Sequence, residues 1–115
     1  MKDITQYINT QVEVVVDRPM YSHHPKYGFV YPVNYGYIPN TVGSDGEPID
    51  AYVLKVEAPV KSFNGKCVAI IHRLDDDDDK LVVVPHDQKD ISDKEIRKLT
   101  HFQEQFFLSK ILRLS

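Results

Sequence analysis

The chain contains 115 residues, of which 42% are hydrophobic and 27% charged, and its formal net charge at pH 7 is −3. This length and composition are typical of one ordinary globular domain, which we expect to span residues 1–115. They argue against a broad basic surface for nucleic acid, and no apolar run approaches the roughly 20 residues of a membrane span. The first residues, Met1-Lys2-Asp3-Ile4, lack the basic and then apolar pattern of a secretory signal, so we expect a cytoplasmic protein.

The N-terminal part of the chain predicts short extended segments rather than helices. The β-branched run Val12–Val16 predicts a strand. A shorter extended piece is expected over residues 28–31. Because proline fixes its own φ angle and lacks an amide hydrogen, Pro32 and Pro39 exclude a helix across residues 31–40.

Three further strands are expected in the middle of the chain. Ala51–Val56 and Lys66–His72 are predicted to be joined through Phe63-Asn64-Gly65, since Asn-Gly is a strong hairpin signal. Leu81–Val84 is the third strand. The only cysteine, Cys67, lies in an alternating apolar run, so an internal disulfide is excluded and a buried thiol is expected.

A helix is expected towards the C-terminus. Ser92-Asp93-Lys94-Glu95 forms a capping box, and apolar side chains follow at helical spacing at Ile96, Leu99, Phe102 and Phe106. Residues 108–115 could be the end of this helix, packed on its own barrel, or part of an apolar strip for a partner. About five short strands with one C-terminal helix predict a mainly β (α+β) fold, a small closed five-stranded Greek-key barrel of the oligonucleotide/oligosaccharide-binding (OB) type.

An acidic segment stands out before the second group of strands. Asp45, Glu47 and Asp50 place three carboxylates within six positions. Gly46 and Pro48 force sharp turns between them, so several carboxylates can face one point. Hard divalent cations prefer such oxygen ligands.

A run of five aspartates, Asp75–Asp79, leads into Lys80. Most such runs are solvated turns that bind nothing specific. If the barrel brings this run beside Asp45–Asp50, the crowded carboxylates repel one another, and magnesium would relieve that repulsion. Lys80 could equally be a structural ion-pair partner, and Tyr35 could be a core residue.

At this point the sequence resembles a known family, the soluble magnesium-dependent inorganic pyrophosphatases. The resemblance is carried by Tyr31–Pro39 followed by Asp45–Asp50, whose family pattern is Asp-Gly-Asp-Pro-x-Asp. It continues through Lys80–Pro85 and through His101–Phe107, which is similar to the family's His-Phe-Phe-Glu-His-Tyr-Lys helix. These segments cover most of residues 17–107.

The resemblance implies roles for individual residues. Asp45 and Asp50 would ligate magnesium, with Asp50 shared between two ions. Glu47 stands where the family has a water-activating aspartate, and Tyr35 matches a tyrosine beside the metals. The acidic loop would supply two more metal ligands, Asp75 or Asp76 and Asp78 or Asp79, and Asp17 is a further candidate ligand. The residues expected to bind phosphate are Lys26, Lys80 and, from a different strand, Arg18.

Two departures from the family pattern concern phosphate binding. Between Lys26-Tyr27 and Tyr31-Pro32 the family has an extra hairpin with a phosphate-binding arginine, and here only three residues remain. The helix's Tyr-Lys pair is replaced by Phe106-Phe107. Two polar contacts to phosphate are therefore expected to be missing.

The resulting functional prediction is magnesium-dependent hydrolysis of pyrophosphate by a metal-activated water, with Mn²⁺ as a possible substitute. The resemblance also implies a homo-oligomer that acts in phosphate metabolism, with no nucleic-acid or membrane partner. The alternative is a degenerate domain that binds metal, a phosphorylated ligand or a protein without turnover. A third possibility, single-stranded nucleic acid stacked on Tyr27, Tyr35 and Tyr37, is disfavoured by the acidic loops.

Overall fold

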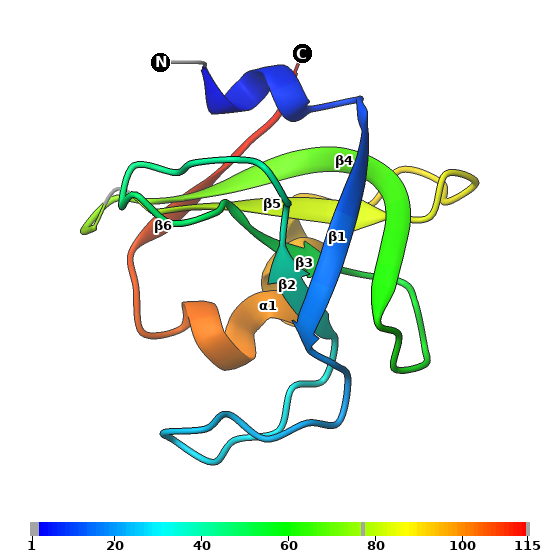
Figure 1. The fold of residues 1–115 in the computed structure, drawn as a ribbon. Coiled ribbons are helices and arrows are strands. Elements are labelled where there is room, and N and C mark those ends of the chain that lie inside the picture. The colour runs from blue at the N-terminus through cyan, green and yellow to red at the C-terminus, as the bar shows by residue number, and fades with distance from the viewer. Residues whose placement is uncertain (1–2, 77, 115) are drawn as a thin grey trace.

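The computed structural model describes residues 3–76 and 78–114. Within them the chain forms η1 (Ile4–Tyr7, a 3₁₀ helix), β1 (Gln11–Arg18), β2 (Asn34–Tyr37), β3 (Asp50–Val53), β4 (Ser62–Arg73), β5 (Asp79–Val84), α1 (Asp93–Glu104) and β6 (Ser109–Leu112) (Figure 1). The expected strands around residues 12–16, 51–56, 66–72 and 81–84 all form, although their ends differ. β2 lies in the region that the two prolines kept from being helical.

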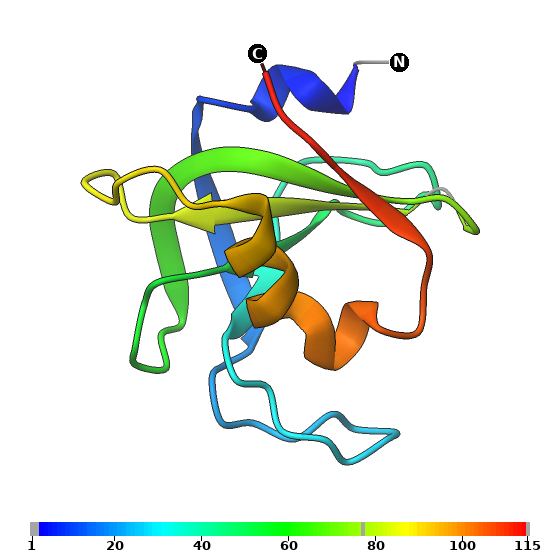
Figure 2. The same ribbon diagram turned by 180° about the vertical axis from the view of Figure 1, so that it is seen from behind.

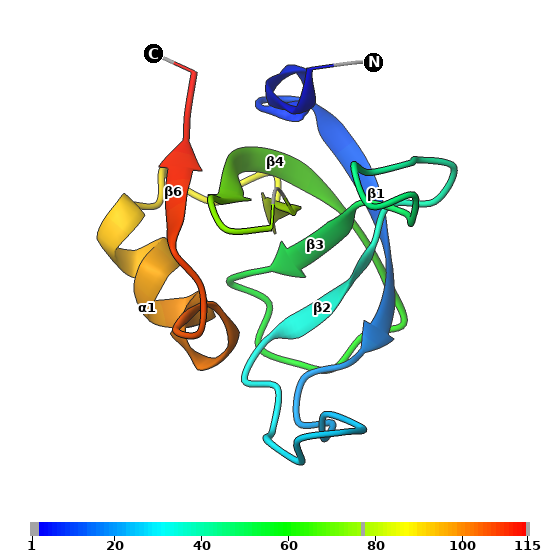
Figure 3. The same ribbon diagram turned by 90° about the vertical axis from the view of Figure 1, so that its left-hand side faces the viewer.

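Five of the strands close into a barrel. Their hydrogen-bonded order is β1-β2-β3-β5-β4, and β1 also pairs with β4, which closes the ring. Neighbouring strands are antiparallel except for β3 and β5. The predicted closed five-stranded barrel with a C-terminal helix is confirmed. A sixth strand, β6, was not predicted; it pairs with the outer edge of β4 and lies beside α1 (Figure 3).

Strand β4 is longer than predicted and bends strongly around the barrel (Figure 1). Its residues 62–66 pair with β1, and residues 66–72 pair with β5. The predicted hairpin turn at Asn64-Gly65 is therefore wrong, because both residues lie inside β4. The glycine serves a close approach between strands: a Cβ at Gly65 would lie 2.5 Å from the carbonyl oxygen of Val84.

Two other predicted strands are shorter in the structure. β3 ends at Val53 instead of residue 56, and Lys55 takes a left-handed φ of 67°, which interrupts an extended chain. The piece expected over residues 28–31 is reduced to one isolated bridge between His23 and Val30. Residues 19–33 consequently form a long loop that projects from the barrel (Figure 1).

Helix α1 begins where the capping box predicted. The Ser92 side chain accepts a hydrogen bond from the Glu95 amide at 3.1 Å. The helix ends at Glu104, so the prediction that Phe106 belongs to its apolar face is wrong; Phe106 is 68% exposed. Of the two alternatives for residues 108–115, the helix end is wrong, because Ser109–Leu112 forms β6. Among the described residues, no helix is long and apolar enough to cross a membrane.

The barrel strands have an inner face towards the barrel interior and an outer face towards α1, which covers that side (Figure 2). Alternate residues separate the two faces, since successive side chains of a strand point to opposite sides. On β5, Leu81 and Val83 belong to the inner cluster, whereas Val82 and Val84 belong to the outer one. Cys67 is buried in the inner cluster, and Ile96 of α1 is buried in the outer cluster.

Candidate functional site

Alternation along three strands brings four charged side chains to one end of the outer face. Asp50 begins β3 and lies on the same face as Tyr52, two positions later. Lys80 on β5 likewise shares the face of Val82, and Arg73, which ends β4, shares the face of Ile71. In the strand register Asp50 is opposite Lys80. The Arg73 amide donates to the Asp78 carbonyl at 2.9 Å, which places Asp78 at the same end of the sheet.

Lys80 is the centre of this cluster. Its Nζ lies 2.5 Å from Oδ2 of Asp50 and 2.8 Å from Oδ2 of Asp78. Lys80 is only 3% exposed, and a buried ammonium of this kind is stable only when it is paired and hydrogen-bonded. Nζ of Lys80 also lies 5.7 Å from the centre of the Tyr35 ring. The structure therefore brings together three of the predicted site residues, Asp50, Lys80 and Asp78, with Tyr35 beside them.

Arg73 is a member of the cluster that the sequence reasoning missed. Its guanidinium donates two hydrogen bonds to Glu104, of 3.0 and 2.8 Å. On the other side, Nη1 lies 3.6 Å from carboxylate oxygens of both Asp76 and Asp78. Burial alone would lower the pKa of Arg73, but the hydrogen bonds and charge of Glu104 raise it, so the guanidinium stays cationic. The sequence feature that could have identified Arg73 is its position at the end of a strand, just before the aspartate run.

A chain of hydrogen bonds from the aromatic core holds Glu104 in place. The Tyr52 hydroxyl donates to Glu104 at 2.6 Å, and the Gln103 amide donates to the Tyr52 oxygen at 2.8 Å. Burial, followed by the charge of Glu104, raises the pKa of Tyr52 well above its usual value. Burial and then the charge of Asp50 do the same for the pKa of Tyr35. Both phenols are thus hydrogen-bond donors at neutral pH.

The acidic loop before β3 folds back on itself as its composition predicted. The Glu47 amide donates to Oδ1 of Asp45 at 3.0 Å, and the Gly43 amide donates to the Glu47 carbonyl at 2.7 Å. Gly46 has a φ of +83°, a conformation that favours glycine. Asp45 and Glu47 are exposed. Asp50 is thus the one residue of this segment that the structure places in the Lys80 cluster.

The aspartate run is divided between different surroundings. Asp78 faces Lys80, whereas Asp79 points to the inner-face side, where its carboxylate lies 2.7 Å from Nδ1 of His72. Asp75 accepts a long hydrogen bond of 3.4 Å from the Leu108 amide. Asp76 lies near Arg73, as described above. Asp77, the middle residue of the run, lies outside the described residues.

The remaining predicted residues lie on β1 and on loop 19–33. Asp17 is exposed on β1, and Arg18 lies near the Tyr31 hydroxyl, where it partly offsets the rise in the pKa of Tyr31 that burial causes. Lys26 is exposed, with its Nζ 5.2 Å from the centre of the Tyr27 ring. Nδ1 of His24 accepts hydrogen bonds from the amides of Lys26 and Tyr27.

The carboxylates of this cluster suit a magnesium ion, which keeps part of its water shell, better than a metal ion that needs three or more protein ligands. Over residues 3–76 and 78–114, no three His, Cys, Asp or Glu side chains converge on one point. Asp50 and Asp78 do converge, because both contact the same Lys80 ammonium. Magnesium is usually held by one or two carboxylates, with waters and substrate phosphates completing its shell. Two convergent carboxylates beside a cationic floor fit that requirement.

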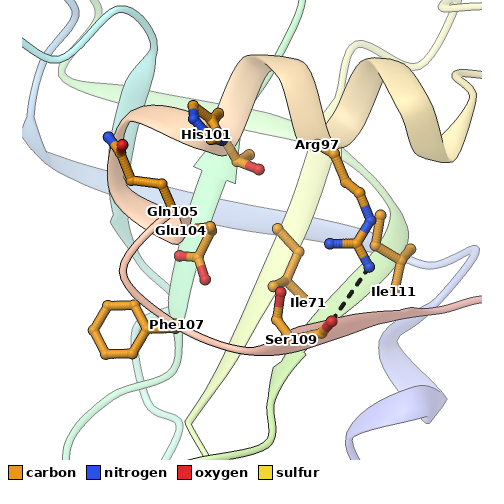
Figure 4. Close-up of a pocket in the computed structure, with 9 residues that line it drawn as sticks. Ile71, Arg97, His101, Glu104, Gln105, Phe107, Ser109 and Ile111 are labelled. Carbon is orange, nitrogen blue, oxygen red and sulfur yellow. Dashed lines mark hydrogen bonds between the residues drawn. The ribbon is translucent and has the colours of Figure 1, made fainter.

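A cleft of about 650 Å³ opens over Arg73 and Lys80 of this cluster. Tyr35, Arg73 and Lys80 form its floor, and we call it the aromatic cleft because other aromatic side chains form its walls. A smaller pocket of about 190 Å³ lies between α1 and β6 (Figure 4). There Arg97 donates to the Ser109 carbonyl at 3.3 Å, and Phe107 lines both this pocket and the cleft.

Comparison with known proteins gives consistent results. A family model described as inorganic pyrophosphatase matches residues 4–112. An inorganic pyrophosphatase of Rickettsia typhi is 31% identical over 126 aligned positions, covering 91% of this chain and 67% of the relative. An inorganic pyrophosphatase of Helicobacter pylori is 32% identical, and the alignment covers 90% of this chain and 70% of the relative. One from Pseudomonas aeruginosa is 38% identical over 74 positions, covering 61% and only 42%. The chain thus spans about two-fifths to 70% of these relatives' length.

Solved structures of similar fold are also inorganic pyrophosphatases. The crystal structure of the Ehrlichia chaffeensis protein superposes with a TM-score of 0.71 and 20% sequence identity, covering 92% of this chain and 87% of that one. The Helicobacter pylori structure gives a TM-score of 0.63 at 22% identity, covering 98% and 87%. At these identities the likeness concerns the fold, and it agrees with the OB-like barrel described above.

Proposed function

The chain belongs to the inorganic pyrophosphatase family, and we propose that it hydrolyses inorganic pyrophosphate to two phosphates with the help of divalent cations. The observation that carries this proposal is the buried Lys80 ammonium between Asp50 and Asp78 at the floor of the cleft. Such a pair of carboxylates beside a fixed cation can hold both a metal ion and the phosphoryl group that it neutralises. The proposal treats residues 1–115 as one catalytic domain.

We assign the cation sites to carboxylates on the cleft side of the sheet. Asp50 and Asp78 are the central ligands, and Asp45 and Asp76 are the additional ones that the exposed loops can supply. Mg²⁺ is the proposed ion and Mn²⁺ a substitute, since hard oxygen ligands suit both. When bound, such ions lower the pKa of a water molecule and neutralise phosphoryl oxygens.

The other side chains of the site have roles in positioning and charge. Glu47 would accept the proton of the attacking water from its exposed loop, and the protonated Tyr35 would donate a hydrogen bond to Asp50 or to phosphate. Lys80 and Arg73 would stabilise negative charge that builds up on the phosphoryl oxygens. Lys26 and Arg18 would contact the outer phosphate at the mouth of the cleft.

Arg73 supports turnover despite the two phosphate contacts that the sequence lacks. Its guanidinium has one edge fixed by Glu104, while Nη1 lies near Asp76 and Asp78. A preorganised guanidinium can bind two phosphate oxygens at once. This side chain can therefore replace part of the grip that the absent arginine hairpin and the Tyr-Lys pair would provide.

Phosphate release from pyrophosphate with Mg²⁺ or Mn²⁺ tests the proposal directly. Asp50→Asn keeps the size of the side chain and removes its charge, and we expect it to lower kcat at least about a hundredfold. Circular dichroism of both proteins controls for folding. If the wild type is as inactive as the variant over a range of pH and metal concentration, the proposed reaction is excluded.

The degenerate binding domain remains a distinct second candidate. It is favoured by the aromatic pair Phe106-Phe107 and by Lys80, which competes with a metal ion for both Asp50 and Asp78. Calorimetry with magnesium and methylenediphosphonate, a pyrophosphate analogue that cannot be hydrolysed, separates the two candidates. Binding without any turnover of pyrophosphate would favour the second candidate, and lack of binding would exclude both.

Two further parts of the proposal concern the protein's setting. We propose a cytoplasmic homo-oligomer, on the basis of the family to which the chain belongs. Sedimentation at several protein concentrations tests the oligomeric state. A monomer at all concentrations would contradict that part and leave the catalytic proposal intact.

A further inference from the structure

One wall of the aromatic cleft comes from loop 19–33 and consists of His24, Tyr27 and Phe29. The His24 ring stacks on Tyr27 with 4.9 Å between ring centres and lies 4.8 Å from Phe29. Hydrogen bonds from the amides of Lys26 and Tyr27 to His24 Nδ1 hold this wall together. Tyr27 nevertheless remains 68% exposed, so much of its ring is open to a ligand.

The other wall comes from the turn after α1 and consists of Phe106 and Phe107. Phe107 packs on the Arg73 guanidinium, 3.7 Å from its ring centre, and its amide donates to the Glu104 carbonyl at 3.0 Å. Phe106 is 68% exposed, although a side chain of this size is normally buried. Two aromatic walls from distant parts of the sequence thus border one opening.

The floor and the walls of the cleft have different chemistry. Arg73 and Lys80 on the floor suit phosphoryl groups, whereas the walls offer rings on which a planar group can stack. A volume of about 650 Å³ lies within the roughly 300–1,000 Å³ of small-molecule sites, and a pyrophosphate ion would fill only part of it. A ligand that combines a diphosphate with an aromatic ring would match both parts.

We infer that the aromatic cleft takes phosphoanhydrides that carry an aromatic ring, with nucleoside diphosphates as the substrate class. This inference rests on the proposed function, since it names a substrate class of the same site. Water attacks the terminal phosphorus and forms the new P–O bond, while the bond to the bridging oxygen breaks with its electron pair on that oxygen. The products are phosphate and the nucleoside monophosphate, and the proton of the water passes to a site carboxylate and then to solvent.

Binding of two analogues that cannot be hydrolysed tests the inference without requiring turnover. Calorimetry with magnesium compares the α,β-methylene analogue of ADP with methylenediphosphonate, which lacks the nucleoside. Stacking of a base on aromatic side chains is worth enough to expect about tenfold tighter binding of the nucleotide analogue to the wild type. Equal affinity for the two analogues would overturn the inference.

Phe106→Ala supplies the structural test, and Leu108→Ala is its matched control. Both residues are exposed apolar side chains of the same turn, but Leu108 does not line the cleft. Phe106→Ala is expected to remove most of the tenfold preference for the nucleotide analogue, and Leu108→Ala to preserve it. Tyr27→Ala is expected to act like Phe106→Ala from the opposite wall. A preference that survives both wall substitutions contradicts stacking in the cleft.

Release of phosphate from ADP and from pyrophosphate then separates this inference from the proposed function. If pyrophosphate is hydrolysed while the nucleotide analogue gains nothing from its base, the inference fails and the proposed function stands. If the nucleotide analogue binds with a preference that depends on Phe106 but neither compound is hydrolysed, the ligand class stands and the proposed function fails.

Discussion

The inner and outer faces of the barrel strands come from the same alternating sequences but differ in what they bury. The inner face is apolar along its middle, with Val14, Cys67 and Leu81 fully buried. The outer face is equally apolar under α1, but at one end it buries Lys80 and Arg73, which are 3% and 6% exposed. The described residues include no buried side-chain nitrogen or oxygen without a hydrogen-bond partner.

The difference shows where this fold can hold charge. On the outer face, segments outside the sheet reach the charged side chains: Glu104 at the end of α1 meets Arg73, and Asp78 before β5 meets Lys80. The barrel interior is closed by its own strands, so an ion there would have no such partner. Adjacent residues of one strand therefore meet different chemistry, and the following predictions test that separation.

The largest expected effect is on stability, from breaking the buried pair of Arg73 and Glu104. Glu104→Gln leaves the guanidinium without its bidentate carboxylate, and loss of one partner of a buried pair typically costs about 3–5 kcal/mol. We expect the free energy of unfolding to fall by about 3 kcal/mol, because Asp76 and Asp78 still lie 3.6 Å from Arg73. Urea unfolding measures this loss.

A double variant shows whether charge is the cause. Arg73→Met combined with Glu104→Leu removes both ions and keeps apolar volume, so most of the lost stability should return. A double variant that is no more stable than Glu104→Gln would mean that the outer face tolerates charge for a reason other than this pairing.

The second expected effect is on activity and compares two neighbouring aspartates. Asp78 faces Lys80 on the outer side, whereas Asp79 contacts His72 on the other side. Asp78→Asn should lower the rate of phosphate release about a hundredfold, because it removes a proposed metal ligand. Asp79→Asn should change the rate less than about threefold. Equal losses would show that the two faces are not functionally separate at this end of the barrel.

Much of the fold could be predicted because its signals are local. The β-branched runs gave the strands, and the capping box at Ser92 gave the start of α1. The predicted hairpin at Asn64-Gly65 was wrong because this glycine is needed for a tertiary contact. A Cβ atom at position 65 would lie only 2.5 Å from the carbonyl oxygen of Val84. Such a contact between distant strands leaves the same dipeptide in the sequence as a turn does.

The sequence predicted which residue types form the candidate site better than which of these side chains contact one another. Asp50, Lys80 and the aspartate run stand out by composition and by resemblance to the family. Strand alternation could also have assigned Asp78 and Asp79 to opposite faces, had the start of β5 been known to within one residue. Arg73 and Glu104 were missed because their pairing joins β4 to the end of α1, 31 positions apart.

The smallest expected effect concerns Cys67, a titratable group on the inner face. Burial raises the pKa of this thiol to about 12, from an ordinary value of 9.0. In the unfolded chain the thiol ionises near pH 9, whereas in the folded protein it stays protonated, so the unfolded state binds fewer protons above that pH. Stability is therefore unaffected below pH 9 and falls as pH rises from 9 towards 12.

Comparison with Cys67→Ala isolates this contribution from the other groups that titrate in alkali. The substitution costs packing at every pH, but it removes the thiol's share of the pH dependence. Between pH 8 and pH 10 the wild type should lose about 1.4 kcal/mol more stability than the variant, the value of one pH unit of differential protonation. If urea unfolding shows that the wild type and Cys67→Ala lose the same stability between pH 8 and pH 10, the thiol ionises inside the folded barrel. The inner face would then accept a charge without a partner, and the contrast with the outer face would fail.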